Sequence, residues 1–248
     1  MDNSAVFSED HKRVNTKFLG VVFLYMFLGL AITALTAFLY ALTLAKLYPD
    51  PNTLSQLSEQ GQNVLFVSVI VAMIIAIIDS IAMPFISRKS GMAPWFGYIL
   101  YALCIGVALS VVLLAGVSYA LIGEAFGITS LIFLVMAAIG AFSKANLTPL
   151  AFVGLALLLG IMMVSTFWLI FMAFNGWGGY YLYYYAVSVG IVVVMMLFIA
   201  YDVNRMVAIA DQGITTNNVA LYCAFSLYGD FISLFLRILM ILMSTRRN

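Results

Sequence analysis

The last apolar run of the chain is Ala220–Met243, with the sequence ALYCAFSLYGDFISLFLRILMILM. Its length matches the roughly 20 apolar residues that an α-helix needs to cross the hydrocarbon core of a bilayer. Asp230 lies well inside this run. An ionised carboxylate near the bilayer centre costs about 2.5–3.5 kcal/mol on insertion scales, so such residues usually face a protein interior or a water path. The run therefore predicts a membrane-spanning helix that carries a functional carboxylate.

The composition of the whole chain points to the same class of protein. Hydrophobic residues make up 65% of the 248 residues and charged residues only 8%, whereas a soluble domain has roughly a quarter of its residues charged. The net charge is +1 and no Lys/Arg-rich block occurs, which argues against a nucleic-acid partner. We therefore predict an all-α, polytopic integral membrane protein whose surroundings are a lipid bilayer.

Seven apolar stretches are each about long enough to cross a membrane. No linker between them is long enough to divide the membrane part into domains. We predict a polar N-terminal tail over residues 1–17, one seven-helix transmembrane domain over residues 18–243 and a short polar tail over residues 244–248. The predicted spans are Phe18–Leu44, Val64–Ile86, Phe96–Gly116, Ala125–Phe142, Leu150–Phe174, Tyr181–Tyr201 and Val219–Met243.

The positions of the basic residues predict the orientation, because cytoplasmic segments of membrane proteins are enriched in Lys and Arg. With the N-terminus inside, the outer loops hold only Lys46. Arg246 and Arg247 would lie outside after seven crossings, and inside if the last segment is re-entrant or one earlier segment does not cross. We predict seven crossings and a cytoplasmic N-terminus. The basic residues then predicted inside are Lys12, Arg13, Lys17, Arg88, Lys89, Lys144 and Arg205.

Several kinds of chemistry lack the residues that they require. The only histidine, His11, lies in the polar N-terminal segment, so no histidine is available in the membrane for a catalytic triad or a zinc site. No lysine lies deep in a span to act as a base, and no Gly-rich phosphate loop occurs. Cys104 and Cys223 lie in apolar runs without paired spacing. We therefore expect neither an enzyme of the common kinds nor a cofactor.

Two charged pairs along the last two spans have structural explanations as well as functional ones. Asp202 and Arg205 are three residues apart, a spacing that places them on one helix face and allows an ion pair at the cytoplasmic end. Asp230 and Arg237 are seven residues apart, about 10 Å along a helix, which strains a direct pair. Arg237 adds a positive charge that would alter ion passage.

The second span also carries an unexpected acid, Asp79, five residues before Pro84. A structural interpretation places its carboxylate near the interface or lets it reach back toward Arg88. The functional interpretation follows from the general cost of a charge in a span. Both interpretations stay open from the residues alone.

The two carboxylates of the last spans gain a specific property if they approach each other. Two carboxylates in a low-dielectric site cannot both ionise cheaply, so Asp202 and Asp230 would share one proton and act as a proton-operated switch. The same oxygens suit Ca²⁺, which prefers six to eight oxygen ligands and would be held only weakly and transiently by two carboxylates. Weak binding is what ion conduction requires. Counting along the predicted spans separates the two carboxylates by several ångströms in depth.

The sequences around both aspartates resemble a known family. YDVNRM over residues 201–206 and AFSLYGDFISLF over residues 224–235 are similar to the paired signatures of the Bax inhibitor-1, or transmembrane Bax-inhibitor-motif, family. EAFGIT over residues 124–129, with Ile132 and Phe133 following, is similar to the beginning of the family's fourth span. The likeness covers nearly the whole apolar region in the number and order of spans.

The resemblance implies a seven-helix bundle with the last helix central, a pH sensor formed by Asp202 and Asp230, and a pH-sensitive calcium leak. Two residues beside the second aspartate depart from the family pattern. Gly229 and Ser233 stand where leucine and asparagine are usual, so we expect looser packing and different hydrogen bonds around Asp230. Arg88 is the nearest candidate for the basic latch found at the end of the second helix in bacterial relatives.

Two functions are compatible with these features. The first is a pH-sensitive Ca²⁺ leak channel gated by protonation of the aspartate pair, with Ca²⁺ as the transported ion. The second is a non-conducting, membrane-embedded regulator that binds other membrane proteins, such as a protease or a death-pathway protein. The compact chain and short tails favour a bacterial plasma membrane, with an organellar membrane as the alternative.

Overall fold

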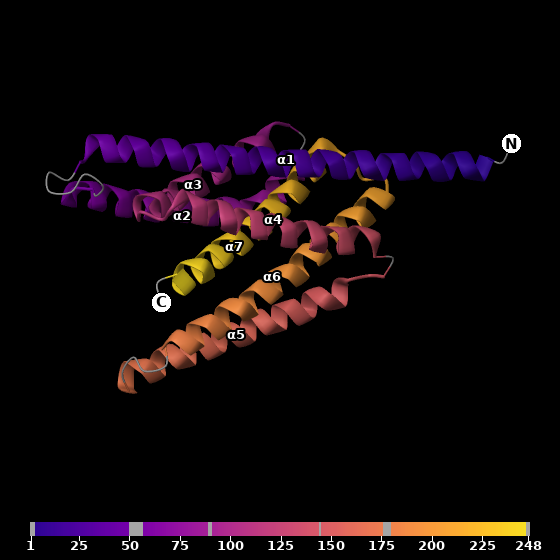
Figure 1. Ribbon diagram of the computed structural model, residues 1–248. Helices are drawn as coiled ribbons and strands as arrows, with labels where there is room; N and C mark the ends of the chain where they lie inside the picture. Colours follow the sequence, from indigo (N-terminus) through magenta and orange to yellow (C-terminus); the bar gives the residue numbers. More distant parts are fainter. Residues whose placement is uncertain (1–2, 50–56, 89–90, 144, 176–179, 247–248) are drawn as a thin grey trace. The chain divides into compact units, whose positions relative to one another are not determined.

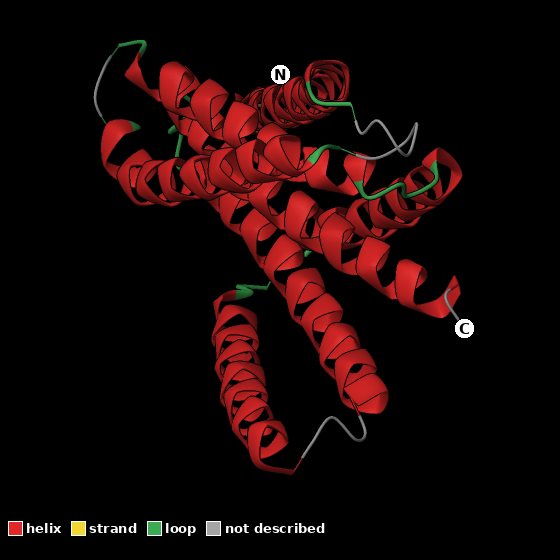
Figure 2. Ribbon diagram, turned by 90° about the vertical axis from the view of Figure 1, so that its left-hand side faces the viewer, coloured by secondary structure: helices red, strands yellow, loops and turns green. Residues whose placement is uncertain are grey.

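The protein is described by a computed structural model over residues 3–49, 57–88, 91–143, 145–175 and 180–246. Every named element in this part of the chain is an α-helix (Figure 2). All seven helices contain a stretch that is long and apolar enough to cross a membrane, which confirms the predicted polytopic architecture. The helices are α1 Asn3–Leu47, α2 Glu59–Ile86, α3 Ala93–Leu114, α4 Tyr119–Phe142, α5 Thr148–Asn175, α6 Tyr180–Asp211 and α7 Asn217–Arg246.

Two helices extend well beyond the spans predicted for them. Helix α1 begins at Asn3, so most of the predicted polar tail is helical. Helix α6 ends at Asp211, ten residues after the predicted end of its span at Tyr201. The prediction was wrong there because it stopped at the first polar residues, whereas a helix satisfies its backbone internally and continues past the hydrocarbon core.

The helices fall into two compact units, and α7 takes part in both. One unit comprises residues 1–119 and 210–228, and the other comprises residues 120–209 and 229–248. In the most apolar stretch of α7, 44% of the residues are buried inside the protein, against 6% in that of α5. Each unit therefore contains part of the last helix, and the central position of that helix stays a prediction.

The first unit is held together by buried hydroxyl groups that connect three helices. The Thr33 hydroxyl on α1 lies 2.9 Å from the carbonyl oxygen of Gly29 and 3.1 Å from that of Ala102 on α3. It also lies 2.5 Å from the Tyr228 hydroxyl on α7, which can donate to it. Because lipid offers no hydrogen-bond partner, a buried hydroxyl in a span needs such acceptors within the protein.

Close approach of α1 and α3 depends on a glycine at the same level. The Tyr98 hydroxyl on α3 donates to the carbonyl oxygen of Tyr25 over 2.8 Å. A Cβ added at Gly29 would overlap this hydroxyl, and it would also come within 3.2 Å of the Tyr228 ring. Tyr98 and Tyr228 are both fully buried, with ring centroids 5.9 Å apart in an edge-to-face arrangement.

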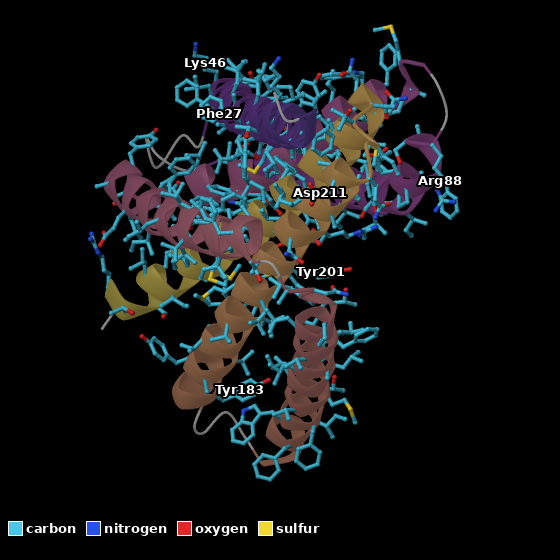
Figure 3. The ribbon with its side chains drawn as sticks, turned by 90° about the vertical axis from the view of Figure 1, so that its right-hand side faces the viewer. Phe27, Lys46, Arg88, Tyr183, Tyr201 and Asp211 are labelled. Atoms are coloured by element: carbon cyan, nitrogen blue, oxygen red, sulfur yellow. The ribbon has the colours of Figure 1, made fainter. Side chains whose placement is uncertain are left out.

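The second unit has an aromatic contact between α4 and the second half of α7. The Phe231 ring lies 5.5 Å from the rings of both Phe126 and Phe133, measured between centroids. Helices α5 and α6 run side by side as a hairpin (Figures 1 and 3). Near the closed end of this hairpin, the Trp168 ring of α5 stacks on the Tyr183 ring of α6 at 5.1 Å.

An ion pair places the end of α7 beside the beginning of α4. Arg246 Nη2 lies 2.5 Å from Glu124 Oε2, and both side chains are exposed. With seven crossings, α7 ends on the side where α4 begins, so this pair agrees with the predicted crossing number. It also gives Arg246, whose position conflicted with the distribution of basic residues, an acidic partner. An exposed pair of this kind contributes only about 0–1 kcal/mol.

Replacing Gly29 by alanine tests the close approach of α1 and α3. We expect Gly29→Ala to destabilise the protein by about 1–3 kcal/mol, because the added methyl group overpacks a fully buried contact. Unfolding of the purified protein in mixed detergent micelles, followed by helical circular dichroism, measures the change.

Gly20→Ala is the matched control, because Gly20 lies on the same helix and a Cβ there would meet no atom within 4 Å. That variant should be neutral or slightly more stable, since alanine favours a helix over glycine by roughly 0.5–1 kcal/mol. Equal effects of the two substitutions would contradict the packing described for Gly29.

Candidate functional site

The lengths of α6 and α7 bring Asp202 and Asp230 to similar depths. Asp202 lies nine residues before the end of α6, and Asp230 lies thirteen residues after the start of α7. These separations correspond to about 14 Å and about 20 Å along the two helices, which are consecutive and joined by a short turn. The two distances differ by about 6 Å, and the ten residues of α6 after Tyr201 place Asp202 inside its helix and not at the helix end.

The carboxyl groups of Asp202 and Asp230 are joined by a hydrogen bond. An ionised carboxylate only accepts hydrogen bonds, so a bond between two carboxyl groups requires that one of them carries a proton. The other oxygen of the Asp230 carboxyl group, Oδ2, is buried and has no hydrogen-bond partner among the described residues. The geometry is therefore compatible with a proton held between the two carboxyl groups, and one buried oxygen atom of Asp230 stays without a partner among the described residues.

The surroundings of the pair are apolar on both helices. Ile199, Ala200 and Val203 on α6 are fully buried, as is Leu234 on α7, and Phe231 is almost completely buried. Asp202 and Asp230 themselves are half-buried beside these apolar residues. Apolar neighbours raise the cost of ionising both carboxyl groups at once.

The two departures from the family pattern lie on different sides of Asp230. A Cβ added at Gly229 would meet no atom within 4 Å, so open space lies beside this residue. The Ser233 side chain is exposed. The expectation of looser packing therefore holds at Gly229, and the exposed Ser233 takes no part in the buried surroundings of the pair.

One comparison with known protein families identifies the family of this chain. The family model described as "Inhibitor of apoptosis-promoting Bax1" matches residues 15–247, nearly the whole chain. This chain belongs to the Bax inhibitor-1 family. The match includes both aspartate motifs and all seven spans. No curated protein matches the chain significantly.

Asn204 is a positioning residue that the sequence prediction missed. Its Nδ2 donates to the carbonyl oxygens of Gly140 and Ser143 at the end of α4, over 3.2 and 3.1 Å. Its Oδ1 accepts from the backbone N–H of Leu147, just before α5, over 3.2 Å. Asn204 follows Asp202 by two residues, so these bonds fix the part of α6 that carries Asp202. Asn204 lies within the YDVNRM stretch, but that stretch gives no sign that its side chain contacts another helix.

A second close contact joins α4 to the same segment of α6. A Cβ added at Gly140 on α4 would overlap the carbonyl oxygen of Ala200 on α6 and would lie 3.0 Å from the Cβ of Val203. Small residues permit this kind of helix approach in membrane proteins. Gly140 and Asn204 together hold α4 against the segment of α6 that contains Asp202.

The structure places the basic residues that the sequence singled out as follows. Arg205 is exposed on α6, and its ion pair with Asp202 stays a prediction. Arg237 is half-buried on α7 and forms no ion pair within the described part of the chain. Arg88 is exposed in the turn that follows α2 (Figure 3). Lys89, Lys144 and Arg247 lie outside the described residues.

The interpretation that Asp79 reaches back to Arg88 is wrong. The Asp79 carboxyl group is buried and faces Gly97 on α3, whereas Arg88 is exposed. The two residues are nine positions apart, roughly 14 Å along a helix, and one side chain is buried while the other is exposed. Asp79 and the pair belong to different units.

The metal-binding capacity of the pair is small. Nowhere in the described chain do three acidic, histidine or cysteine side chains come together to hold an ion. Ca²⁺ prefers six to eight oxygen ligands, so a Ca²⁺ ion at Asp202 and Asp230 would need most of its ligands from water or the backbone. The pair suits transient contact with a cation better than storage of one.

Replacing Asn204 by aspartate tests its positioning role. The carboxylate of Asn204→Asp would face the carbonyl oxygens of Gly140 and Ser143 without a proton to donate. We expect a loss of about 1–3 kcal/mol in unfolding free energy, the cost of buried acceptors left without donors. Detergent unfolding measures the loss. The control is Asn63→Asp, because Asn63 is exposed on α2; a loss as large in that variant would contradict the role assigned to Asn204.

Proposed function

We propose that this member of the Bax inhibitor-1 family is a pH-sensitive Ca²⁺ leak channel in which the Asp202–Asp230 pair is the gate. The protein acts without a cofactor and without catalysing a reaction, and Ca²⁺ is its transported ion. The observation that carries the proposal is the hydrogen bond between two carboxyl groups inside a membrane-spanning bundle. A purely structural contact between these helices would be made at lower cost by apolar side chains.

The shared proton gives the pair two states with different forces between α6 and α7. With the proton present, the hydrogen bond ties the helices together and the pair carries a single negative charge. Without the proton, two carboxylates at hydrogen-bonding distance repel each other strongly in apolar surroundings. The pair in that state either separates or binds a cation between its oxygens. Loss of one proton thus changes both helix contact and attraction for Ca²⁺.

Open space beside Gly229 supports the same mechanism. A cation path needs room for water or an ion next to the ionised carboxylates, because a bare ion in apolar surroundings is too costly. The leucine that is usual in the family at this position would fill such space. Release of the ion remains easy because only two carboxylates hold it.

Ca²⁺ flux into proteoliposomes across a range of pH tests the proposal directly. An amide can donate a hydrogen bond to the remaining carboxylate, so Asp202→Asn and Asp230→Asn each imitate the state with one shared proton. We expect wild-type flux to change with pH, and each variant to keep one flux level over the same range.

Asp211→Asn is the matched control, because Asp211 is an exposed acid on the same helix as Asp202 (Figure 3). This variant should keep the wild-type pH response. The channel proposal fails if the folded wild-type protein carries no Ca²⁺, or if both pair variants respond to pH as the wild type does.

A non-conducting regulator is the second candidate, and the description printed for the family favours it. That description names inhibition of the apoptosis-promoting protein Bax1. A regulator would bind another membrane protein through its lipid-facing helices and would show no flux in the experiment above. We place the protein in a bacterial plasma membrane, with an organellar membrane as the alternative.

A further inference from the structure

The first unit contains a buried acid that the proposed gate does not use. Asp79 on α2 is 7% exposed, and its Oδ2 atom has no hydrogen-bond partner among the described residues. Its Oδ1 atom lies 3.0 Å from the position that a Cβ on Gly97 would occupy, and Met83 Sδ lies 3.5 Å from that position. A carboxyl group therefore fills the space that Gly97 leaves between α2 and α3.

Among the described residues of its unit, no basic side chain is buried with Asp79. The charge of Asp79 acts on Tyr101 and Cys104, which are both on α3 and carry no positive charge. The described basic residues of α1 with placed side chains are Lys17 and Lys46, and both are exposed. The titratable groups that α7 contributes to the unit are Tyr222, Cys223 and Tyr228, also without positive charge.

We propose that Asp79 is a second proton-binding site, formed by α2 and α3, which holds its proton at neutral pH. An ionised carboxylate without a cation or a donor for one of its oxygens is costly in a span. Protonation removes the charge and leaves only an ordinary polar group to accommodate. The site shares no residue with the Asp202–Asp230 pair, and the inference does not rest on the proposed Ca²⁺ leak.

The neighbours of Asp79 select a proton over a metal ion. Ca²⁺ requires six to eight oxygen ligands, whereas Asp79 is surrounded by a glycine, a thioether, a thiol and a phenol. The close fit against Gly97 also excludes a hydrated ion from that side. A proton needs no further ligands and no further space.

The proton at Asp79 preserves the close contact between α2 and α3. Ala72 and Ala76 of α2 form a small buried cluster with Cys104 of α3, on the same face as Asp79. An ionised Asp79 would draw water or a cation into this contact, which small side chains keep tight. The site thus links the proton on Asp79 to the packing of the two helices.

Infrared difference spectroscopy of the purified protein in lipid tests the proposal. A protonated carboxyl group absorbs in the carbonyl region apart from the ionised form. We expect the difference spectrum between the wild type and Asp79→Asn at neutral pH to contain the band of one protonated carboxyl group, with or without added Ca²⁺. The control Glu59→Gln changes an exposed acid on the same helix and should remove no such band.

The same band should remain in Asp202→Asn and Asp230→Asn, which separates this site from the proposed gate. Absence of the band from the difference spectrum of folded Asp79→Asn overturns the proposal, and so does its loss from the wild type on addition of Ca²⁺.

A second measurement keeps the proposal testable if Asp79→Asn does not fold. Dicyclohexylcarbodiimide is an apolar reagent that adds to protonated carboxyl groups: the carboxyl oxygen bonds to the carbodiimide carbon and the proton moves to its nitrogen. An open apolar groove of about 620 Å³, lined mainly by α2 and α3, reaches Cys104 on the face that also carries Asp79. Mass spectrometry of the wild type should find the adduct at Asp79 and none at Glu59. An unmodified Asp79 in that case overturns the proposal.

Discussion

The hydrogen bond between Asp202 and Asp230 is the interaction on which the account of this protein depends. It connects α6 to the second half of α7, and it exists only while the pair holds a proton. In water such a bond would add little, because each carboxylate would be solvated and ionised. Among apolar side chains two ionised carboxylates would repel each other strongly, and our proposal therefore makes this proton the control of the contact between the two helices.

The rest of the structure supports this contact without a hydrophobic force between helices. Lipid is as apolar as leucine, so helices in a membrane are held by close packing and by hydrogen bonds. The protein uses both in each unit. Gly29 and Thr33 join α1 to α3 and α7 in the first unit, and Gly140 and Asn204 hold α4 against α6 in the second. In both places a glycine permits the approach and a polar side chain fixes it.

The sequence alone predicted the seven helices, because long apolar runs can have few other structures. It also identified both aspartates, since charges in such runs are conspicuous. It did not predict how far α6 extends, because hydropathy marks the hydrocarbon core and contains no signal for a helix that continues past Asn204 and Arg205. The depth of Asp202 relative to Asp230 was therefore uncertain until the helix ends were known.

Contacts between helices were beyond sequence reasoning for a related reason. Small or polar residues such as Asn204, Gly140 and Gly97 are common in membrane spans. Their importance comes from contacts with atoms of another helix. The sequence also did not predict the burial of Asp79, because an ion pair with Arg88, nearby in sequence, accounted for a charge in that span. Seven apolar helices identify a membrane protein, whereas their mutual contacts determine which charges are buried.

A double-mutant cycle on Asp202 and Asp230 tests the central claim most directly. The unfolding free energies of the wild type, Asp202→Ala, Asp230→Ala and the double variant are measured in the same detergent mixture at neutral pH. If the two carboxyl groups share a proton, the first truncation already breaks the bond, and the double variant is less destabilised than the sum of the single variants by about 0.5–3 kcal/mol. Additive effects, within about 0.3–0.5 kcal/mol, would contradict the shared proton.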